Sequence, residues 1–465
     1  MYPLCRVVRV AREAGPEALE RRTLLSSVGG LSVVEFALPG GGVELRVTGT
    51  GGDDSIAVSP AGAGVEVFDQ VVGASSVFAG PYRSVRVDAG DGNDHVDVSG
   101  AVSTPAALHG GAGDDVLSGG AGADRLYGGD GADVLSGGDG DDVLVTLGGG
   151  AADVASGGLG RDSFWLDKGK LADGAPDVTP DETLSGSVHR VGSFYASAAL
   201  PTAVRAATRV VALDGADLPD PLVSDPAFVY HRFADHPLFS AAGPSGDDVV
   251  QGSLGDCYFL SVLLSTAELD PTRIRDSVVD LGDGTYAVQF GMGKSKKTVR
   301  VDADLPLWID GETPAYAGLG ADGSMWVAVM EKAFASYRKG GARGYAGLDA
   351  GWMKETYNLL GSPSRTARSN SSDLLIHYIQ SELAAGRSVT YATSVTPSAG
   401  APLVGGHAYA VEGVNLDGAG NPVSIRLRNP WAVDGAGNDG SDDGYVTVTA
   451  HEALASLMGV CSARV

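Results

Sequence analysis

Two kinds of hydrophobic patterning divide the chain. From about residue 31 to 98, apolar and polar residues alternate, as in Val43-Glu44-Leu45-Arg46-Val47. This period of two predicts short strands separated by glycine-rich turns. From about residue 244 the apolar segments lengthen, and residues 257–268 have the spacing and composition of a helix. Between 168 and 235, Pro, Asp, Ser and Ala are frequent and no period persists, which predicts a linker with some local order around 187–214.

A nine-residue repeat occupies residues 110–165. Its copies are GGAGDDVLS, GGAGADRLY, GGDGADVLS and GGDGDDVLV, and then, after an inserted Thr146-Leu147, GGGAADVAS and GGLGRDSFW. One aspartate recurs in each copy, at positions 115, 124, 133, 142, 153 and 162. An apolar residue follows two positions later in nearly every copy: Leu117, Leu126, Leu135, Leu144, the small Ala155, and Phe164.

The residue types in the repeat indicate the structural role of each position. Glycines allow sharp turns with positive φ, while carboxylates and turn carbonyls are the oxygen ligands that Ca²⁺ prefers. The apolar residue would lie on a short strand and point into a narrow core, so that stacked units make a solenoid. A disordered Gly/Asp-rich linker is the alternative, but it explains neither the register nor the leucines. Without calcium we expect that disordered state, because stacked carboxylates repel one another.

The repeat resembles the RTX (hemolysin-type) nonapeptide, GGxGxDx-apolar-x, which forms a parallel β-roll. This resemblance implies Ca²⁺ ligands at Asp115, Asp124, Asp133 and Asp142. Asp153 and Asp162 match less well, because Ala151 replaces a glycine and the insertion breaks the phase.

Composition narrows the possible functions. The chain has 465 residues, with 58 acidic against 33 basic residues and a net charge of −25. Its length predicts several domains, and its charge argues against nucleic-acid binding. No apolar run is long enough to span a bilayer, so no membrane segment is expected. The three cysteines cannot form a disulfide framework, and the odd number leaves room for a reactive thiol.

Cys257 is the candidate nucleophile. It follows Gly252 and Gly255, and Asp256 can cap the predicted helix, which places the thiol in the first turn. Partial positive charge at a helix N-terminus lowers the pKa of a thiol and activates it. A cysteine in that position, considered by itself, is more commonly a buried core residue.

Two later segments favour catalysis. His407 lies in VGGHAYAVEGV, and Asn429 ends a predicted strand in SIRLRNPW. The order Cys, His, Asn is that of papain-like thiol proteases. In that arrangement His407 exchanges a proton with the thiol, Asn429 orients the imidazole through Nδ1, and Trp431 shields their hydrogen bond from water.

Residues 236–465 resemble the protease core of calpains. The motifs that carry this resemblance are QGSLGDCYFL at 251–260, VRVDADLPLW at 299–308, the segment 325–351 beginning MWVAVMEKAFASY, GHAYAV at 406–411, and LRNPW at 427–431. The resemblance implies the nucleophile Cys257, the base His407, the orienting Asn429, the oxyanion-hole glutamine Gln251 and the shielding Trp431. Tyr258 and Ala432 stand where calpains usually have Trp and Gly.

The same resemblance suggests a calcium site in the protease core, with ligands Asp248 and Glu331 and the Gly243 carbonyl. The alternative is that Glu331 pairs with a base such as Lys332 or Lys339 on a solvated helix. The loop 434–444 is acidic enough to bind a cation, without assignable ligands. The family's penta-EF-hand and membrane-binding sandwich domains have no counterpart here, so no regulatory subunit is expected.

The sequence thus predicts a multidomain chain: an all-β parallel β-roll, or calcium solenoid, followed by an α+β papain-like, calpain-type protease core. The expected division is 1–30, a targeting-like or disordered segment; 31–167, a β-rich region whose best repeats span 110–165; 168–235, a linker or propeptide; and 236–465, the catalytic domain. The predicted function is a Ca²⁺-dependent cysteine endopeptidase acting on protein substrates, with the roll serving export, folding or surface attachment. The alternative is a non-catalytic calcium-binding surface or adhesion protein with an inactive protease-like domain. The expected location is extracellular or at the surface of a bacterial cell, with a cytoplasmic location as the alternative.

Overall fold

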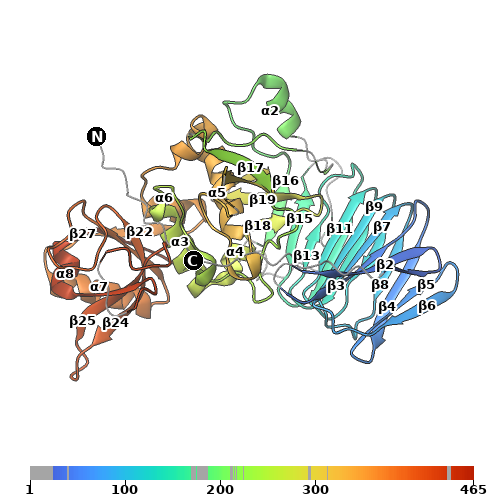
Figure 1. The fold of residues 1–465 in the computed structure, drawn as a ribbon, viewed down its shortest axis with the longest axis horizontal. Helices are drawn as coiled ribbons and strands as arrows, with labels where there is room; N and C mark the ends of the chain where they lie inside the picture. Colours follow the sequence, from blue (N-terminus) through green and yellow to red (C-terminus); the bar gives the residue numbers. More distant parts are fainter. Residues whose placement is uncertain are drawn as a thin grey trace.

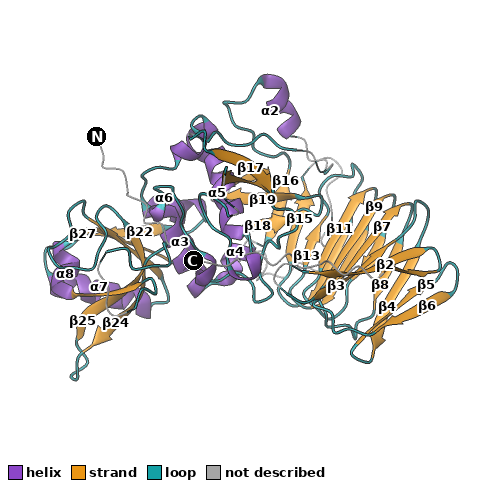
Figure 2. Cartoon of the chain, viewed as in Figure 1, coloured by secondary structure: helices purple, strands orange, loops and turns teal. Residues whose placement is uncertain are grey.

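Three parts follow one another along the molecule: a solenoid, a helical lobe and a β lobe (Figure 1). The computed structural model describes residues 25–38, 41–168, 174, 187–209, 213, 215, 217–223, 225–291, 295–309, 311, 313–436 and 441–465. Strands dominate the solenoid at one end, and the helices gather in the middle and in the β lobe (Figure 2).

The solenoid consists of two facing sheets. Among the described residues, one sheet has nine strands in the order β1-β2-β3-β7-β9-β11-β13-β15-β16 and the other has seven in the order β14-β12-β10-β8-β4-β5-β6. Pairing is parallel except at the N-terminal end, where β1-β2-β3 and β4-β5-β6 are antiparallel. The strands are β1 (Leu25–Val28), β2 (Leu31–Ala37), β3 (Val43–Thr48), β4 (Ser55–Ala61), β5 (Gly64–Asp69), β6 (Ala74–Phe78), β7 (Ser84–Asp91), β8 (His95–Val98), β9 (Ala106–Ala112), β10 (Val116–Ser118), β11 (Arg125–Asp130), β12 (Val134–Asp139), β13 (Val143–Val145), β14 (Val154–Leu159), β15 (Ser163–Asp167) and β16 (Val188–Val191).

Two nonapeptides make one coil, so successive repeats alternate between the sheets. Leu126 pairs with Leu144 in the nine-stranded sheet, and Leu117 pairs with Leu135 in the other. The repeated apolar positions are fully buried between the sheets and form the solenoid core, at Leu117, Leu126, Leu135, Leu144, Ala155 and Phe164. The predicted parallel β-roll followed by an α+β region is therefore confirmed.

The solenoid is longer than the repeat. Parallel pairing starts at β3, well before residue 110, and β16 adds to the far end of the nine-stranded sheet. Part of the predicted 168–235 linker therefore continues the solenoid, and a later part carries the short helix α2 (Thr202–Thr208). Most of the predicted segment 1–30 lies outside the described residues.

The helical lobe packs around α3 and α5. Its helices are η1 (Gly246–Asp248), α3 (Cys257–Leu269), α4 (Pro271–Arg275), η3 (Ala321–Gly323), α5 (Trp326–Tyr337), η4 (Arg338–Gly341), η5 (Gly344–Gly347) and α6 (Met353–Leu359). Its strands are β17 (Phe228–Arg232), β18 (Val278–Asp280), β19 (Thr285–Phe290), β20 (Lys297–Asp302) and β21 (Asp304–Trp308), with β17 pairing with β21 and β18-β19-β20 forming a meander.

The β lobe is a six-stranded antiparallel sheet with two helices, and it packs on α3. Its order is β22-β27-β23-β24-β25-β26, and β23 and β24 contact α3. The elements are β22 (Ser364–Ala367), α7 (Ser372–Ala384), β23 (Ser388–Thr393), β24 (Ala408–Leu416), β25 (Pro422–Arg428), β26 (Tyr445–Thr449), α8 (Ala450–Ala455) and β27 (Leu457–Ala463).

The stacking of glycines between coils gives the first prediction. Gly129 has φ +110°, and a Cβ atom there would lie 2.1 Å from the Gly111 carbonyl oxygen. We expect Gly129→Ala to destabilise the solenoid by more than about 2 kcal/mol, because both the backbone conformation and the space are lost. Gly51→Ala, where a Cβ has no neighbour within 4 Å, is the matched control and should cost less than about 0.5 kcal/mol. Calcium-dependent unfolding followed by circular dichroism measures both variants, and equal stabilities would contradict the glycine argument.

Candidate active site and calcium sites

The candidate nucleophile stands at the first residue of a buried helix. Helix α3 begins at Cys257, as predicted, and nearly all its other side chains are buried. The Cys257 side chain is half-buried and packs on the core of the helical lobe. Asp256 occupies the N-cap position, but its side chain makes no capping hydrogen bond. Asp256 therefore stands at the predicted N-cap position, although its carboxyl does not cap the helix.

Asp256 and Glu331 form a pair of buried carboxyls beside the nucleophile. Both side chains are almost inaccessible to solvent, and the two carboxyl groups influence each other's titration. Burial raises the pKa of Asp256 to about 7 and raises the pKa of Glu331 well above its usual value. Burial next to a like charge therefore favours the protonated, uncharged form of both carboxyls.

The surroundings of Glu331 show that one alternative drawn from the sequence is wrong. Glu331 does not pair with Lys332 or Lys339 on a solvated helix. Helix α5 is buried around Glu331, which accepts a hydrogen bond from the Ala317 amide at 3.0 Å. The Lys332 ammonium instead lies 2.5 Å from both Asp220 and Asp302.

His407 and Asn429 form the second half of the candidate site. His407 lies just before β24, and Asn429 follows β25, the neighbouring strand of the sheet. The Asn429 Oδ1 atom lies 2.8 Å from Nε2 of His407, and both side chains are buried. The sequence-based expectation of a contact through Nδ1 is therefore wrong, because this approach of the amide uses Nε2. Nδ1 is left as the nitrogen that can exchange a proton with a thiol.

Burial sets the charge of this imidazole. Desolvation lowers the pKa of His407 to about 4, although the hydrogen bond that Nε2–H donates to Asn429 opposes the shift. The ring is therefore neutral at pH 7, and a neutral imidazole can accept a proton. Trp431 covers one side of it, with ring centroids 4.5 Å apart.

Asn429 is held in place by its own loop. Its Nδ2 donates to the Asp434 carbonyl oxygen at 3.2 Å, and the Trp431 amide donates to its Oδ1 at 3.1 Å. Ala432, at the position where calpains usually have Gly, adopts φ +58°. This left-handed conformation favours glycine, so the loop keeps its turn at a cost in strain.

Tyr258, the other departure from the calpain pattern, fits its surroundings. The ring is buried, and its hydroxyl donates to the Leu348 carbonyl oxygen at 3.0 Å. The Arg338 guanidinium lies 5.1 Å from the ring centroid. Replacement of the usual Trp therefore leaves no unpaired polar group at this position.

Several contacts bring the two lobes together at the candidate site. The backbone N–H of Gln251 donates to the Pro430 carbonyl oxygen at 2.8 Å, which joins the loop before Cys257 to the loop after Asn429. Gln251 Nε2 donates to the Leu254 carbonyl oxygen at 2.6 Å, which fixes the side chain and leaves its second N–H. Arg428, adjacent to Asn429, lies 2.6 Å from Glu268 at the far end of α3 and also contacts Asp247.

The candidate core calcium ligands are engaged in hydrogen bonds. Asp248 is fully buried and accepts from the Ser245 amide, the Ala321 amide, the Ser324 hydroxyl and the Trp326 indole N–H, at 2.8 to 3.0 Å. The Gly243 carbonyl accepts from the Ser240 hydroxyl at 3.0 Å. A core calcium ion would have to replace several of these bonds, and its ligands stay a prediction.

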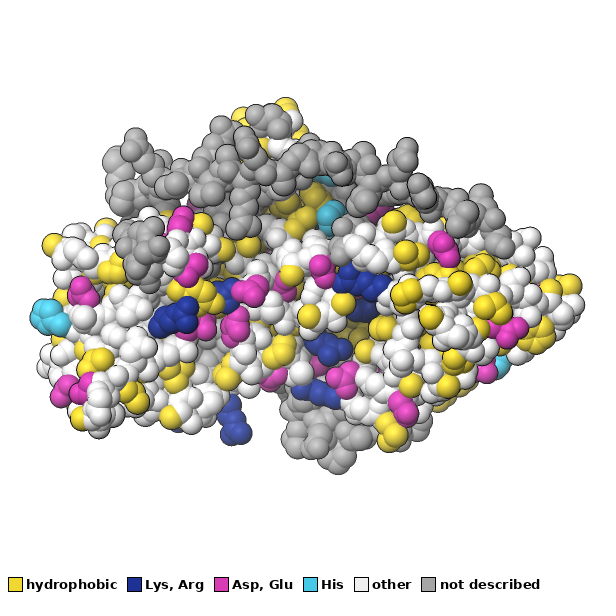
Figure 3. Space-filling view, turned by 60° about the horizontal axis from the view of Figure 1, so that its bottom comes forward, with side chains coloured by type: hydrophobic (Ala, Val, Ile, Leu, Met, Phe, Trp, Pro, Cys, Tyr) yellow, Lys and Arg dark blue, Asp and Glu magenta, His cyan; other side chains and the backbone are white. Residues whose placement is uncertain are grey.

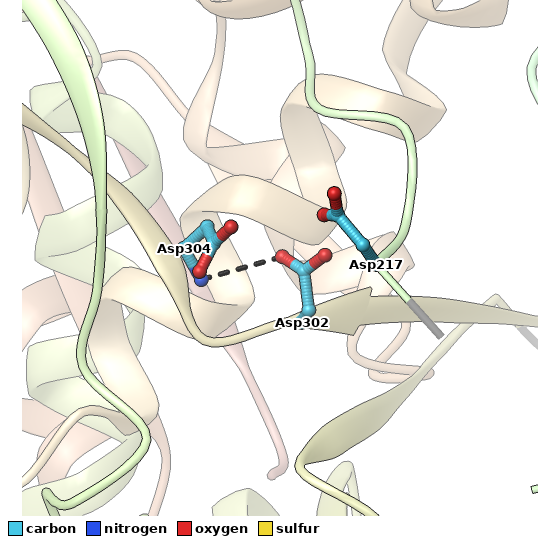
Figure 4. A group of neighbouring side chains, drawn as sticks. All are labelled: Asp217, Asp302 and Asp304. Carbon is cyan, nitrogen blue, oxygen red and sulfur yellow. Dashed lines mark hydrogen bonds between the residues drawn. The ribbon is translucent and has the colours of Figure 1, made fainter. Parts of the chain in front are cut away.

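A different group of carboxylates lies within the helical lobe: Asp217, Asp302 and Asp304 (Figure 4). Lys332 already occupies this region, since its ammonium contacts Asp302 and the Asp304 carbonyl oxygen at 2.5 and 2.6 Å. Because the buried lysine already neutralises part of the acidic charge, we assign no metal ion to this group.

In the solenoid the repeated aspartates form two ladders along its length. In one ladder the amides of Asp94, Asp115 and Asp133 donate to Oδ1 of Asp115, Asp133 and Asp153; in the other the amides of Asp124 and Asp142 donate to Oδ1 of Asp142 and Asp162. These bonds are 2.7 to 3.0 Å long. Asp153 and Asp162, the weaker candidates, continue both ladders, because the Thr146-Leu147 insertion lengthens the coil without displacing them.

The ladder chemistry fits calcium. Oδ2 of Asp115 and of Asp142 is buried and accepts no hydrogen bond from the described residues. Burial raises the pKa of Asp115 to about 7 and that of Asp142 to about 8. Carboxyl oxygens stacked in this way need a proton or a cation, and the surrounding glycine-rich turns supply carbonyl oxygens of the kind Ca²⁺ accepts.

Two further rungs escaped the sequence analysis. The Asp54 amide donates to Oδ1 of Asp94 at 2.7 Å, so the ladder extends through the turns at 51–54 and 90–94. Their Gly/Asp spacing resembles the repeat only loosely. The signal was present in Gly-Gly-Asp-Asp and Gly-Asp-Gly-Asn-Asp, although without a nine-residue period.

Comparison with known proteins agrees with this architecture. Residues 229–447 match the calpain family cysteine protease model, and residues 109–144 and 147–170 match the RTX calcium-binding nonapeptide repeat. Curated relatives include the calpain-type cysteine protease DEK1 of Zea mays (28% identical over 42% of this chain and 9% of its own length), the calpain-2 catalytic subunit of Bos taurus (29%, 43% and 30%) and calpain-A of Drosophila melanogaster (30%, 43% and 26%). The matched region thus spans less than a third of each of these relatives.

The fold and the comparisons define a two-part class of protein: an RTX-type calcium solenoid joined to a thiol-protease fold. The chain carries a calpain-family cysteine protease domain preceded by RTX calcium-binding repeats. The matched repeats are calcium-binding repeats, so the prediction of Ca²⁺ as the cofactor is confirmed. In the described part of the chain, every helix is too short or too polar to cross a bilayer.

The raised pKa values of the ladder give a pH prediction. Folded Asp115 and Asp142 keep their protons up to about pH 7 and 8, whereas an unfolded Asp loses its proton at about pH 4. Without calcium, stability should therefore be lost as the pH rises through the folded pKa values. Calcium binds the ionised form, so the increase in Tm on adding calcium should be larger at about pH 8 than at about pH 6. Thermal unfolding at both pH values tests this, and Asp142→Asn should reduce the difference; an increase independent of pH would contradict it.

Proposed function

We propose that the chain is a calcium-dependent cysteine endopeptidase with the triad Cys257, His407 and Asn429. The observation that carries the proposal is the buried hydrogen bond between His407 and Asn429, on a loop that is itself bonded to the loop before Cys257. The start of α3 gives the Cys257 thiol a positive local potential, and burial keeps His407 neutral.

The proposed chemistry uses these groups in sequence. His407 Nδ1 takes the Cys257 proton, and the thiolate attacks a peptide carbonyl carbon. The carbonyl oxygen becomes an oxyanion, which accepts hydrogen bonds from the Cys257 amide and from the second Nε2 hydrogen of Gln251. The tetrahedral intermediate then collapses, and its C–N bond breaks while His407 protonates the leaving amine. Water, deprotonated by His407, then cleaves the thioester and releases the free acid and the thiol. Asn429 keeps the imidazole oriented throughout.

The domain boundaries and the location belong to the same proposal. Strand β17 begins at Phe228 and pairs with β21, which supports a catalytic domain that starts before residue 236. The described residues 217–223 contact the helical lobe through Asp220 with Lys332 and Leu222 with Tyr345, which favours a structural role over that of an inhibitory propeptide. Millimolar external calcium suits a solenoid of this type, so we place the protein outside the cell or on its surface, where the solenoid serves export, folding or attachment. Protein chains are the proposed substrates, with neither nucleic acid nor a regulatory subunit required.

Hydrolysis of unfolded casein across a calcium titration tests the activity. We expect cleavage that depends on calcium and that falls by at least about 10³-fold in Cys257→Ala, because the nucleophile is removed. Cys461→Ala is the matched control: this second cysteine is buried on β27 against Thr366, and its loss should leave cleavage within about twofold.

The outcomes separate the candidate functions. Absence of cleavage in a folded, reduced, calcium-loaded sample would contradict the protease proposal and favour a calcium-binding surface protein. Equal cleavage by Cys257→Ala and the unsubstituted chain would indicate a contaminating protease.

Glu331→Gln tests calcium binding in the protease core. The amide keeps the size and polarity of the side chain but cannot become an anionic ligand. If Asp248 and Glu331 bind calcium, the calcium concentration for half-maximal hydrolysis should rise at least about tenfold in Glu331→Gln, while the calcium midpoint for solenoid folding stays unchanged. An unchanged requirement for hydrolysis would place the calcium dependence outside this pair.

A further inference from the structure

The two sheets of the solenoid differ at the ninth position of the nonapeptide. In the seven-stranded sheet this position is serine, at Ser118, Ser136 and Ser156. In the nine-stranded sheet it is a large apolar residue, at Tyr127, Val145 and Trp165, which pair in register. Because the eighth position points into the solenoid core, the ninth points outward. An isolated solenoid would expose these three side chains to water.

The helical lobe covers this apolar face. Tyr127, Val145 and Trp165 are buried, and they share one hydrophobic cluster with Val279, Leu281 and Ala287 of the β18–β19 hairpin. The serines of the opposite sheet stay partly or largely exposed. The Trp165 ring also stacks on His189, at 3.9 Å between centroids, and His189 lies 3.0 Å from Gln289 on β19.

Charged residues extend the contact to α4. The Arg161 guanidinium lies 2.5 Å from Asp276 and contacts the Thr272 hydroxyl, while Arg275 lies 3.6 Å from Asp141. The face in Figure 3 shows Lys and Arg side chains gathered near its middle with acidic side chains beside them. Helix α4 follows α3 after a single residue, Asp270, which caps it. The contact is therefore one short helix away from the helix that begins with Cys257.

The charged contacts adjoin the calcium ladder. Asp141 and Arg161 occupy the fifth position of their repeats, immediately before the ladder residues Asp142 and Asp162. The Arg161 amide donates to Asp141 Oδ1 at 3.0 Å, so the two corners are also bonded to each other. A cavity of about 40 Å³ lies between the solenoid and the helical lobe here, and its lining includes Asp142, Arg161 and Asp276.

From this arrangement we infer that the solenoid is a calcium-dependent support of the protease domain. Calcium held by Asp142 and Asp162 orders the corners that carry Asp141 and Arg161 and the apolar face beside them. The helical lobe then gains its contacts at α4 and at the β18–β19 hairpin. The inference builds on the proposed function, since it assigns to the solenoid a stabilising role in addition to export or attachment.

Hydrogen exchange of the full-length Cys257→Ala chain, with and without calcium, tests this inference independently of activity. Calcium should slow exchange in α4 and the β18–β19 hairpin by about fivefold or more, together with the solenoid strands. Arg161→Ala should lose most of this effect in α4 while the solenoid strands keep theirs. Arg46→Ala is the matched control: its ion pair with Glu44 lies wholly within the solenoid, and its side chain is similarly exposed, at 37% against 36% for Arg161.

Asp142→Asn separates calcium in the solenoid from calcium in the protease core, because it removes one ladder carboxylate and leaves Asp248 and Glu331 in place. We expect it to weaken the calcium effect in α4. The inference is overturned if α4 exchanges equally with and without calcium while the solenoid gains protection. It is also overturned if Arg161→Ala behaves like Arg46→Ala, or if Asp142→Asn retains the full effect. Because the readout is protection of an inactive variant, it stands even if the chain proves not to be a protease.

Discussion

The burial of stacked carboxylates is the constraint on which the solenoid depends. Every coil places aspartates in ladders with Oδ1 bonded to a backbone amide of the coil before it, and at Asp115 and Asp142 the second oxygen is left without a hydrogen bond among the described residues. Burying an anion without a partner costs far more than one hydrogen bond returns, so such a ladder is stable only when protons or cations neutralise it. The leucine core is narrow and its strands are three to eight residues long. On this argument we expect calcium to be a condition of folding here rather than a ligand added to a finished domain.

The candidate active site follows a different constraint, because its parts come from distant positions in the chain. Arg428 and the Gln251–Pro430 hydrogen bond join the lobes on either side of the loop that holds Asn429. Within this junction burial disfavours charge: it keeps the His407 imidazole neutral at pH 7 and raises the pKa values of Asp256 and Glu331. While both carboxyls of the pair hold their protons, the thiol at the start of α3 has no buried negative charge beside it. Ionisation of the pair would place a negative charge near the sulfur and oppose the thiolate.

Local features could be predicted from the sequence, and features that require tertiary contact could not. The nine-residue period fixes both the turn glycines and the buried leucines, so the solenoid core and helix α3 were accessible to prediction. The nitrogen of His407 that meets Asn429 depends on how β24 and β25 present their ends, which no motif encodes. The contact between Asp256 and Glu331 depends on α5 crossing beside α3, and the local preference of Asp for an N-cap position pointed elsewhere. Asp54 and Asp94 were missed because the ladder tolerates turns of irregular length that obscure the period.

The ninth repeat position illustrates why some information in a sequence is readable only with the fold in hand. Serine and a large apolar residue alternate at this position along the sequence, as Ser118, Tyr127, Ser136 and Val145. An alignment on the nine-residue period places all four in one column, where they look like random variation. Once two repeats make one coil, the same residues separate into a polar sheet and an apolar sheet, and only the apolar one faces the helical lobe. The asymmetry follows from burial, since an apolar outward stripe on an isolated solenoid would invite aggregation. The solenoid and the protease domain therefore share a hydrophobic cluster. A cation that stabilises the coils also stabilises the apolar face that the coils present to the helical lobe.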